Sequence, residues 1–190
     1  GPVPARLPLV ALVGNPNCGK TAIFNLLTGS HQKVANYAGV TVERKEGLFN
    51  APSGRPVRLI DLPGAYSLDP VTPDERVTVD VLLGQRAGES VPDLIVCVVD
   101  ATNLRQNLRL ALSLQRLNRP MILALNMIDV AERNGLRVDA ARLASELGIP
   151  VAQTVAIRPS GVAELARLID DFRPSGKTAP LAGIGPLTDA

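Results

Sequence analysis

Residues 14–21, with the sequence GNPNCGKT, constrain this chain more than any other segment. They match the pattern G-x-x-x-x-G-K-S/T and stand between an apolar run at residues 9–13 and a helical pattern at residues 20–28. In that setting, the backbone N–H groups of the loop and the N-terminus of the helix surround phosphate oxygens. We expect Lys20 to neutralise the β- and γ-phosphates and the Thr21 hydroxyl to bind Mg²⁺. The predicted phosphate-binding residues are Asn15, Pro16, Asn17, Cys18, Gly19, Lys20, Thr21 and Ala22.

Short apolar runs rich in Val, Ile and Leu alternate with helical patterns along the chain. The runs lie at residues 9–13, 58–62, 94–99, 121–125 and 151–155, and the helical patterns at residues 20–28, 72–83, 104–117, 138–147 and 161–172. Such runs are typical of strands buried on both faces, and the alternation indicates βαβ units. Residues 42–50 and the turn that follows them predict a hairpin. We therefore expect an α/β fold, with a doubly wound, mainly parallel sheet of about six strands and one antiparallel edge strand.

The length of 190 residues indicates one domain with short extensions. We expect residues 1–6 to be an N-terminal extension or a tag remnant, and residues 7–172 to form the nucleotide-binding domain. Residues 173–190 are rich in Pro and Gly, which predicts a linker or a flexible tail. Because the longest apolar runs are far shorter than the ~20 residues of a membrane helix, we expect the chain to be soluble.

Charge and aromatic content argue against a nucleic-acid partner. Twenty basic and eighteen acidic residues give a formal net charge of +2, which is spread along the chain. Three Phe, two Tyr and no Trp leave few rings on which bases would stack. The two cysteines, Cys18 and Cys97, lie far apart and outside any Cys/His cluster, which argues against a structural zinc site.

The sequence DLPG at residues 61–64 follows an apolar run that we expect to neighbour the first strand. DxxG is common by chance, so its position after a strand carries the interpretation. An aspartate there reaches the shell of a phosphate-bound Mg²⁺, and the N–H of Gly64 reaches a γ-phosphate. We therefore expect Asp61 to be a magnesium ligand, and Gly64 to act in catalysis with Lys20.

The sequence NMID at residues 126–129 ends another apolar run, at the edge where open α/β sheets place their ligands. The Asp129 carboxylate is suited to accept hydrogen bonds from N1–H and from the 2-amino group of guanine, a pair that adenine lacks. We expect Asn126, Met127 and Asp129 to bind the base, so that GTP is selected over ATP.

These segments in this order, together with VTVERKEG at residues 40–47 and DLPGAYSL at residues 61–68, resemble the cytosolic G domains of the FeoB family of bacterial ferrous-iron transporters. The resemblance covers about residues 7–172. It implies that Thr41 is the switch threonine, which closes on Mg²⁺ and the γ-phosphate and acts in catalysis. It also implies that Asn17 is a potassium ligand and that Val155 and Ala156 belong to the last loop that contacts guanine.

Three positions depart from the pattern of that family and its relatives. Val155 replaces the usual serine and removes a hydrogen bond from the guanine loop. Ala38 stands where the switch loop often has a proline. Ala65 stands where Ras-like GTPases carry a glutamine that orients water. Because a methyl group cannot orient water, we expect slow hydrolysis, with the water placed by backbone groups or by another element.

The resemblance also implies a setting for the domain. It implies a regulatory switch that binds GTP and GDP, hydrolyses GTP with Mg²⁺ and K⁺ as cofactors, and couples nucleotide state to passage of Fe²⁺. The implied partners are guanine nucleotide, the membrane permease portion of the same full-length protein and small accessory Feo proteins. The implied location is the cytoplasmic face of the bacterial inner membrane.

Three other functions fit parts of the sequence. A GTPase of ribosome assembly or tRNA modification shares the three motifs, but the missing basic patches and the DLPGAYSL segment disfavour it. A P-loop kinase has no use for NMID together with a loose switch loop. A non-catalytic nucleotide-binding interaction module is made conceivable by Ala65, and absence of GTP turnover would favour it.

Overall fold

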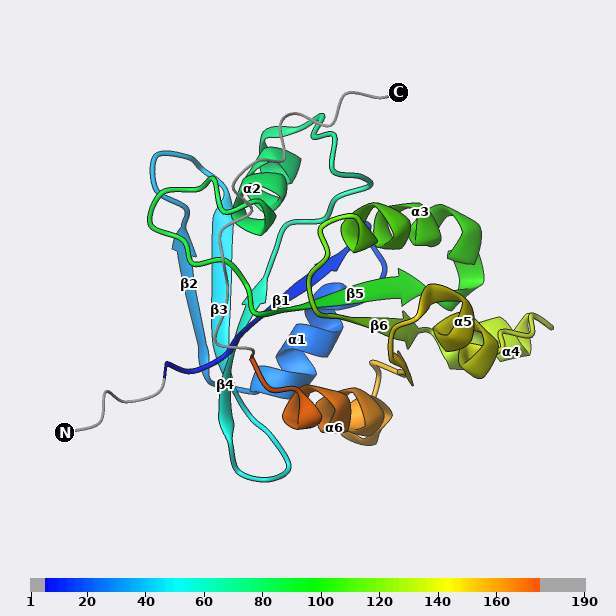
Figure 1. Cartoon of the computed structure of the whole chain (residues 1–190). Helices are drawn as coiled ribbons and strands as arrows, with labels where there is room; N and C mark the ends of the chain where they lie inside the picture. The colour runs from blue at the N-terminus through cyan, green and yellow to red at the C-terminus, as the bar shows by residue number, and fades with distance from the viewer. Residues whose placement is uncertain (1–5, 175–190) are drawn as a thin grey trace.

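The computed structural model describes residues 6–174 and is built around a seven-stranded sheet (Figure 1). The strands are β1 (Leu9–Gly14), β2 (Gln32–Asn36), β3 (Glu43–Asn50), β4 (Pro56–Asp61), β5 (Leu94–Asp100), β6 (Met121–Asn126) and β7 (Val151–Gln153). Their order across the sheet is β2-β3-β4-β1-β5-β6-β7. Strands β4, β1, β5, β6 and β7 run parallel, whereas β3 is antiparallel to both β4 and β2. The predicted α/β fold is therefore confirmed.

The helices form two layers, one on each face of the sheet. They are α1 (Lys20–Thr28), α2 (Pro73–Leu82), α3 (Leu104–Gln115), α4 (Ile128–Arg133), α5 (Ala140–Leu147) and α6 (Ala163–Asp171), with 3₁₀ turns η1 (Ala101–Asn103) and η2 (Pro159–Val162). Helices α1 and α6 cover one face, and α2, α3 and α5 cover the other (Figure 1).

The central strands form because both of their faces are covered. Every residue of β1 and of β6 is buried, which fits their continuous Val, Ile and Leu runs. Phe24 of α1 and Ile169 of α6 are fully buried against one face, and Leu110 of α3 is buried against the other. Burial of each such side chain contributes about 1.5–3 kcal/mol relative to its exposure to water. These layers fix the carboxyl ends of β1, β4 and β6, where the three motifs begin.

Two elements differ from the sequence-based expectation. Strand β2 makes the sheet seven-stranded instead of six-stranded, and it places β3 one position inside the edge. Four of its five residues are exposed, so it has no apolar alternation, and its pairing with β3 determines its conformation. The short helix α4 after β6 was not expected either, because its six residues are too few to show a helical period. The proposed extension at residues 1–6 and tail at residues 173–190 fall almost entirely outside the described residues.

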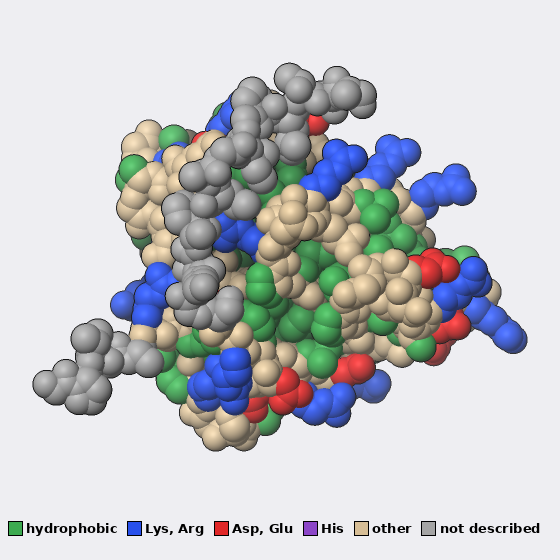
Figure 2. Space-filling model, viewed as in Figure 1, with side chains coloured by type: hydrophobic (Ala, Val, Ile, Leu, Met, Phe, Trp, Pro, Cys, Tyr) green, Lys and Arg blue, Asp and Glu red, His purple; other side chains and the backbone are tan. Residues whose placement is uncertain are grey.

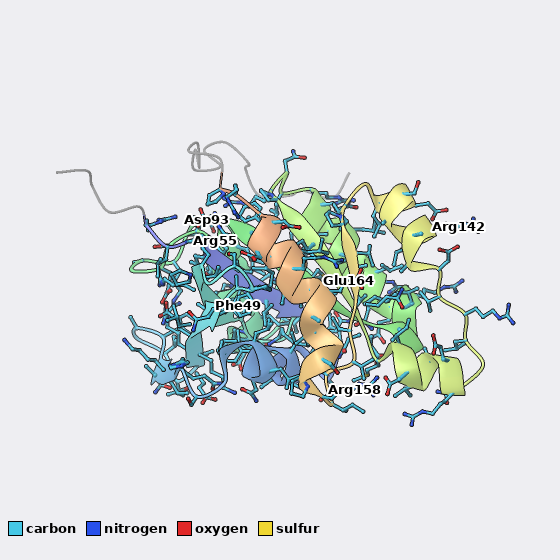
Figure 3. All side chains as sticks on the ribbon, turned by 90° about the horizontal axis from the view of Figure 1, so that it is seen from below. Phe49, Arg55, Asp93, Arg142, Arg158 and Glu164 are labelled. Atoms are coloured by element: carbon cyan, nitrogen blue, oxygen red, sulfur yellow. The ribbon has the colours of Figure 1, made fainter. Side chains whose placement is uncertain are left out.

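The loop between β3 and β4 holds the end of α6. Arg55 donates from one guanidinium nitrogen to the carbonyls of Ile169, Asp170 and Phe172 at 3.0, 2.9 and 2.8 Å. Figure 3 shows Arg55 beside the end of this helix. The carbonyls at a helix end have few partners within the helix, so Arg55 acts as a cap. The cap fixes the C-terminal end of α6 against the loop between β3 and β4.

The surface carries mixed charge with one exception. Figure 2 shows acidic and basic side chains scattered over this face, and basic side chains extending from the region of α3. Arg105, Arg109 and Arg116 are exposed there, and α3 itself contains no Asp or Glu. None of the helices between residues 6 and 174 is long and apolar enough to cross a lipid bilayer.

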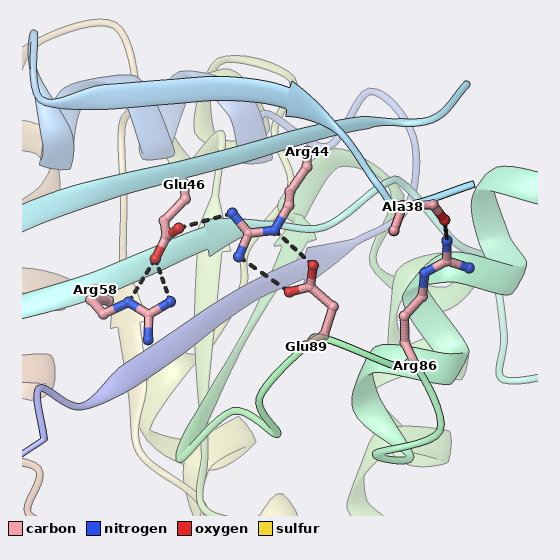
Figure 4. Close-up of polar contacts among 6 residues, drawn as sticks. All are labelled: Ala38, Arg44, Glu46, Arg58, Arg86 and Glu89. Carbon is pink, nitrogen blue, oxygen red and sulfur yellow. Dashed lines mark hydrogen bonds and ion pairs between the residues drawn. The ribbon is translucent and has the colours of Figure 1, made fainter. Parts of the chain in front are cut away.

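Glu46 of β3 links two arginines on one side of the sheet (Figure 4). Arg44 donates to one of its carboxylate oxygens at 2.8 Å, and Arg58 of β4 donates to the other at 2.6 Å. Partial burial raises the pKa of Glu46. The two guanidinium groups together lower the pKa by more than burial raises it, so the pKa lies below its ordinary value of 4.5.

This lowered pKa predicts a loss of stability in acid. A carboxyl whose pKa is lower in the folded state stabilises the fold above its unfolded pKa, and this contribution is lost as the pH falls through the folded pKa. We expect the free energy of unfolding to fall less between pH 7 and pH 3 in Glu46→Gln than in the unsubstituted protein. Urea unfolding at several pH values measures this difference. Glu146→Gln on the exposed face of α5 is the control, and equal pH dependence of all three proteins would contradict the prediction.

Candidate functional site

A cavity of about 620 Å³ lies at the carboxyl end of β1. Its walls come from the loop after β1, from the start of α1, from the loop after β4 and from the start of α2. The lining residues are Asn15, Pro16, Asn17, Cys18, Gly19, Lys20, Thr21, Ala22, Gly64, Tyr66, Thr72, Asp74 and Glu75. The fold therefore brings together all eight predicted phosphate-binding residues, 15–22, and also Gly64.

The loop after β1 needs its glycines. Gly19 has a φ of 89°, a region that other residues rarely adopt, and a Cβ at Gly19 would lie 2.2 Å from Nδ2 of Asn126. A Cβ at Gly14 would lie 2.6 Å from Sγ of Cys18. The Cys18 side chain is thus packed under the loop, and burial raises the pKa of its thiol despite the nearby Lys20 ammonium. The loop passes close to the strands, and its residues line the cavity.

Lys20, Thr21 and Asp61 meet at the floor of this cavity. The Lys20 ammonium pairs with one carboxylate oxygen of Asp61, and the Thr21 hydroxyl donates to the other at 3.0 Å. Lys20 and Asp61 are both buried, with 8% and 5% of their surfaces exposed. A buried charge of either sign would be costly alone, so each stabilises the other. Asp61 is the last residue of β4, next to β1, as the sequence predicts.

Asn126 connects the phosphate loop to the far side of the sheet. Its amide donates to the Cys18 carbonyl at 3.0 Å and accepts from the Thr154 hydroxyl at 2.9 Å. All three residues are buried, with 1% of Asn126 exposed. In this structure the side chain therefore positions the loop, and it does not line the cavity.

The other predicted base-binding residues lie beyond the cavity lining. Met127 has a φ of 61°, and its methyl carbon would lie 3.6 Å from a Cβ at Gly19, so it borders the phosphate loop. Asp129 in the first turn of α4 is partly exposed and lies 3.7 Å from the guanidinium of Arg133. Val155 and Ala156 follow β7, and Val155 lines a separate cavity of about 630 Å³ with Ile128 and other residues. The structure does not test their roles in base binding.

Thr41 lies apart from the phosphate cavity. It is exposed in the connection between β2 and β3, and it is not among the residues that line the cavity. Its predicted role as a magnesium ligand requires this connection to move, and it stays a prediction.

Four lining residues were not predicted: Tyr66, Thr72, Asp74 and Glu75. The sequence TPDE at residues 72–75 carries a helix-start signal, and the Thr72 hydroxyl does accept from the Glu75 N–H at 3.2 Å. That signal identifies a helix N-terminus, but only the fold places it beside the phosphate loop. The Glu75 carboxylate is buried there, 3.5 Å from the N–H of Tyr66.

The Asn126 contacts generate a prediction on stability. Asn126→Ala leaves the Cys18 carbonyl and the Thr154 hydroxyl buried without partners, and we expect it to lower the free energy of unfolding by about 2–4 kcal/mol. Thr154→Val keeps the side-chain shape and removes one hydrogen bond, so we expect a loss of about 1 kcal/mol. Urea unfolding of both variants and of the double variant measures these values. Equal losses in the two single variants would contradict the central position of Asn126.

Comparison with known proteins agrees with this arrangement. A family model described as Ferrous iron transport protein B matches residues 9–169. The Fe(2+) transporter FeoB of Escherichia coli K12 is 45% identical over 168 residues, which span 86% of this chain but 21% of the transporter. The cytosolic domain of the T. maritima FeoB iron transporter in its GMPPNP form is 42% identical with a TM-score of 0.80, over 87% of this chain and 64% of that one.

The solved G domain of T. maritima FeoB is also 42% identical, with a TM-score of 0.75, over 87% of this chain and 96% of that one. This chain therefore spans about a fifth of the length of the curated transporters it matches, and most of the isolated G domain. The family match covers nearly all of the described residues, including the cavity and the three motifs. The chain belongs to the ferrous iron transport protein B (FeoB) family, which is the family that its motifs predict.

Proposed function

We propose that this chain is the GTP-binding and GTP-hydrolysing switch domain of a bacterial ferrous iron transporter. The observation that carries the proposal is the cavity formed by the GNPNCGKT loop, with Lys20 and Thr21 on its floor and Gly64 in its wall. The relatives with solved structures include FeoB cytosolic domains in GDP and GMPPNP forms.

The phosphate groups are bound by the loop and by Lys20. The N–H groups at the start of α1 and the Lys20 ammonium face one cavity, which suits an anion with several oxygens. A phosphate that enters the cavity competes with Asp61 for the Lys20 ammonium, and Asp61 is then available to another cation.

Thr21 and Asp61 would hold a magnesium ion. Their hydroxyl and carboxylate oxygens lie 3.0 Å apart at the floor of the cavity, and such oxygen ligands are those that Mg²⁺ prefers beside phosphates. When bound, the ion neutralises charge on the β- and γ-phosphates. Thr41 is the further proposed ligand in the triphosphate state.

The hydrolytic step depends on positioning, because Ala65 offers no polar side chain. Ala65 is buried, and its N–H donates to the Gly14 carbonyl at 3.0 Å. The N–H of Gly64 is left to stabilise the γ-phosphate, and a Cβ at Gly64 would lie 3.0 Å from Pro16. We infer slow intrinsic turnover, with a potassium ion bound by Asn17 as the additional cation. Asn17 is exposed on the cavity wall and so is accessible to that ion.

The transporter setting is part of the same proposal. The domain would lie at the cytoplasmic face of the inner membrane, joined to a membrane permease portion and contacted by small accessory Feo proteins. Residues 7–172 would constitute the domain. The curated relatives support this setting because they are Fe(2+) transporters about five times longer than the matched segment.

Guanine selectivity is tested at Asp129. Asp129→Asn should weaken GDP binding relative to xanthosine diphosphate by about 2–4 kcal/mol, because the pairing of donors and acceptors with the base is inverted. Glu132→Gln in the same helix, with an exposed side chain, is the control. Calorimetric titration with both nucleotides measures the preference. An unchanged preference of Asp129→Asn for GDP over xanthosine diphosphate would contradict the proposal that NMID binds the base.

Potassium dependence is tested by turnover. We expect faster GTP hydrolysis in KCl than in NaCl at equal ionic strength, which removes charge screening as the cause. Because Asn17 has a φ of 66°, Asn17→Gly removes the side chain without backbone strain, whereas Asn17→Ala adds strain. Both variants should lose the potassium effect and retain GDP binding. Equal rates in the two salts for the unsubstituted domain would refute the role of Asn17, and absence of turnover in either would favour a non-catalytic module.

A further inference from the structure

The connection between β2 and β3, residues 37–42, is tied to the segment that follows α2. Arg44 at the start of β3 makes two hydrogen bonds with Glu89, of 2.9 and 3.1 Å. Arg86 donates to the carbonyl of Ala38 at 2.5 Å. Both contacts are shown in Figure 4, and they join parts of the chain that are 45 and 48 residues apart. We call Arg44, Arg86 and Glu89 the arginine clamp.

Tyr37 lies beneath the arginine clamp. Its ring is buried, and the guanidinium carbons of Arg44 and Arg86 lie 6.0 and 5.7 Å from the ring centre. A cation near an aromatic ring is attracted to it more strongly when the cation is partly desolvated. The side chains of Arg44 and Glu89 are only 21% and 13% exposed, so water screens their pairing weakly. The clamp therefore holds Tyr37, and with it the connection that contains Thr41.

Helix α2, which precedes Arg86 and Glu89 of the clamp, contacts the phosphate cavity at its N-terminal end. Helix α2 begins with Thr72, Asp74 and Glu75 around the cavity, and its Thr78 hydroxyl donates to the Pro63 carbonyl at 2.7 Å. Arg86 and Glu89 lie just beyond the C-terminal end of this helix. Helix α2 thus contacts the DLPG loop directly, and the segment after its C-terminal end contacts the connection that contains Thr41 through the clamp.

We propose that the arginine clamp holds residues 37–42 in the conformation in which Thr41 is away from the phosphate cavity. Arg44 and Glu89 are then determinants of the relative affinity of the domain for GDP and GTP. In this structure Thr41 is exposed and outside the cavity lining. Movement of Thr41 to a γ-phosphate requires Ala38 and Tyr37 to leave Arg86 and Arg44. The clamp thereby opposes the triphosphate state and leaves the diphosphate state unaffected. This inference rests on the proposed function.

The first test compares two nucleotides. Glu89→Gln keeps the side-chain size and removes the charge, and Arg86→Ala removes the contact with Ala38. We expect each to raise the affinity for GMPPNP relative to GDP by about fivefold, because an ion pair is lost only from the GDP-preferring conformation. Glu146→Gln, which breaks an exposed ion pair with Arg142 on α5, should leave the ratio unchanged. An unchanged ratio in both clamp variants would overturn the proposal.

The second test needs no nucleotide. The N–H of Tyr37 donates to the Val42 carbonyl at 2.9 Å, so exchange of this amide with deuterium reports opening of the connection. Exchange over residues 37–42 should be at least about threefold faster in Glu89→Gln than in Glu146→Gln. Faster exchange with an unchanged nucleotide ratio would show a structural contact only and overturn the proposal.

The two tests also separate this proposal from the proposed function. If the unsubstituted domain binds neither GDP nor GMPPNP, the proposed function is wrong. The proposed role of the clamp in the relative affinity for the two nucleotides is then wrong as well. The exchange measurement then still decides whether the clamp holds residues 37–42. If nucleotide binds and exchange over residues 37–42 is the same in Glu89→Gln as in Glu146→Gln, the role of the clamp is refuted and the proposed function stands.

Discussion

The contact between the phosphate loop and Asn126 is the constraint on which the site depends. A loop that is to bind phosphate through its N–H groups needs support that does not use those groups, and Asn126 provides it by donating to the Cys18 carbonyl. The Asn126 amide lies so close to the backbone of the phosphate loop that only glycine fits at position 19. Asn126 in turn is held by Thr154 after β7. The loop after β1 is therefore fixed by strands on the far half of the sheet, and the predicted base-binding motif begins at the residue that supports the phosphate loop.

Most of the fold and the phosphate-binding part of the site are predictable from the sequence, because they depend on local patterns. Buried parallel strands require continuous apolar runs, so β1, β5 and β6 are evident without a structure. Parallel strands end at one edge, so residues that follow such runs converge. That reasoning places Lys20, Thr21 and Asp61 at one edge of the sheet, and in the structure Lys20 and Thr21 both contact Asp61.

The remaining features depend on tertiary contacts that leave little local signal. Strand β2 is polar and exposed, and its pairing with β3 determines its conformation. The cavity wall from Thr72 to Glu75 depends on the position of α2 relative to β4, although the helix start itself is visible in the sequence. Thr41 lies outside the cavity lining, and the role that the family pattern implies for it requires a second conformation of the connection between β2 and β3.

The same charges that stabilise this structure also determine what a ligand must displace. The Lys20 ammonium is buried against Asp61, and Arg44 is held by Glu46 and Glu89, so both cations are already neutralised. A polyphosphate that enters the cavity pairs with the Lys20 ammonium only when the ion pair between Lys20 and Asp61 breaks. The buried Asp61 carboxylate then requires another cation. The Thr21 hydroxyl is beside that carboxylate, so ligand anion and metal cation are favoured together and disfavoured singly. Under the proposed function, binding is therefore an exchange of partners within one charge-balanced group of Lys20, Thr21 and Asp61.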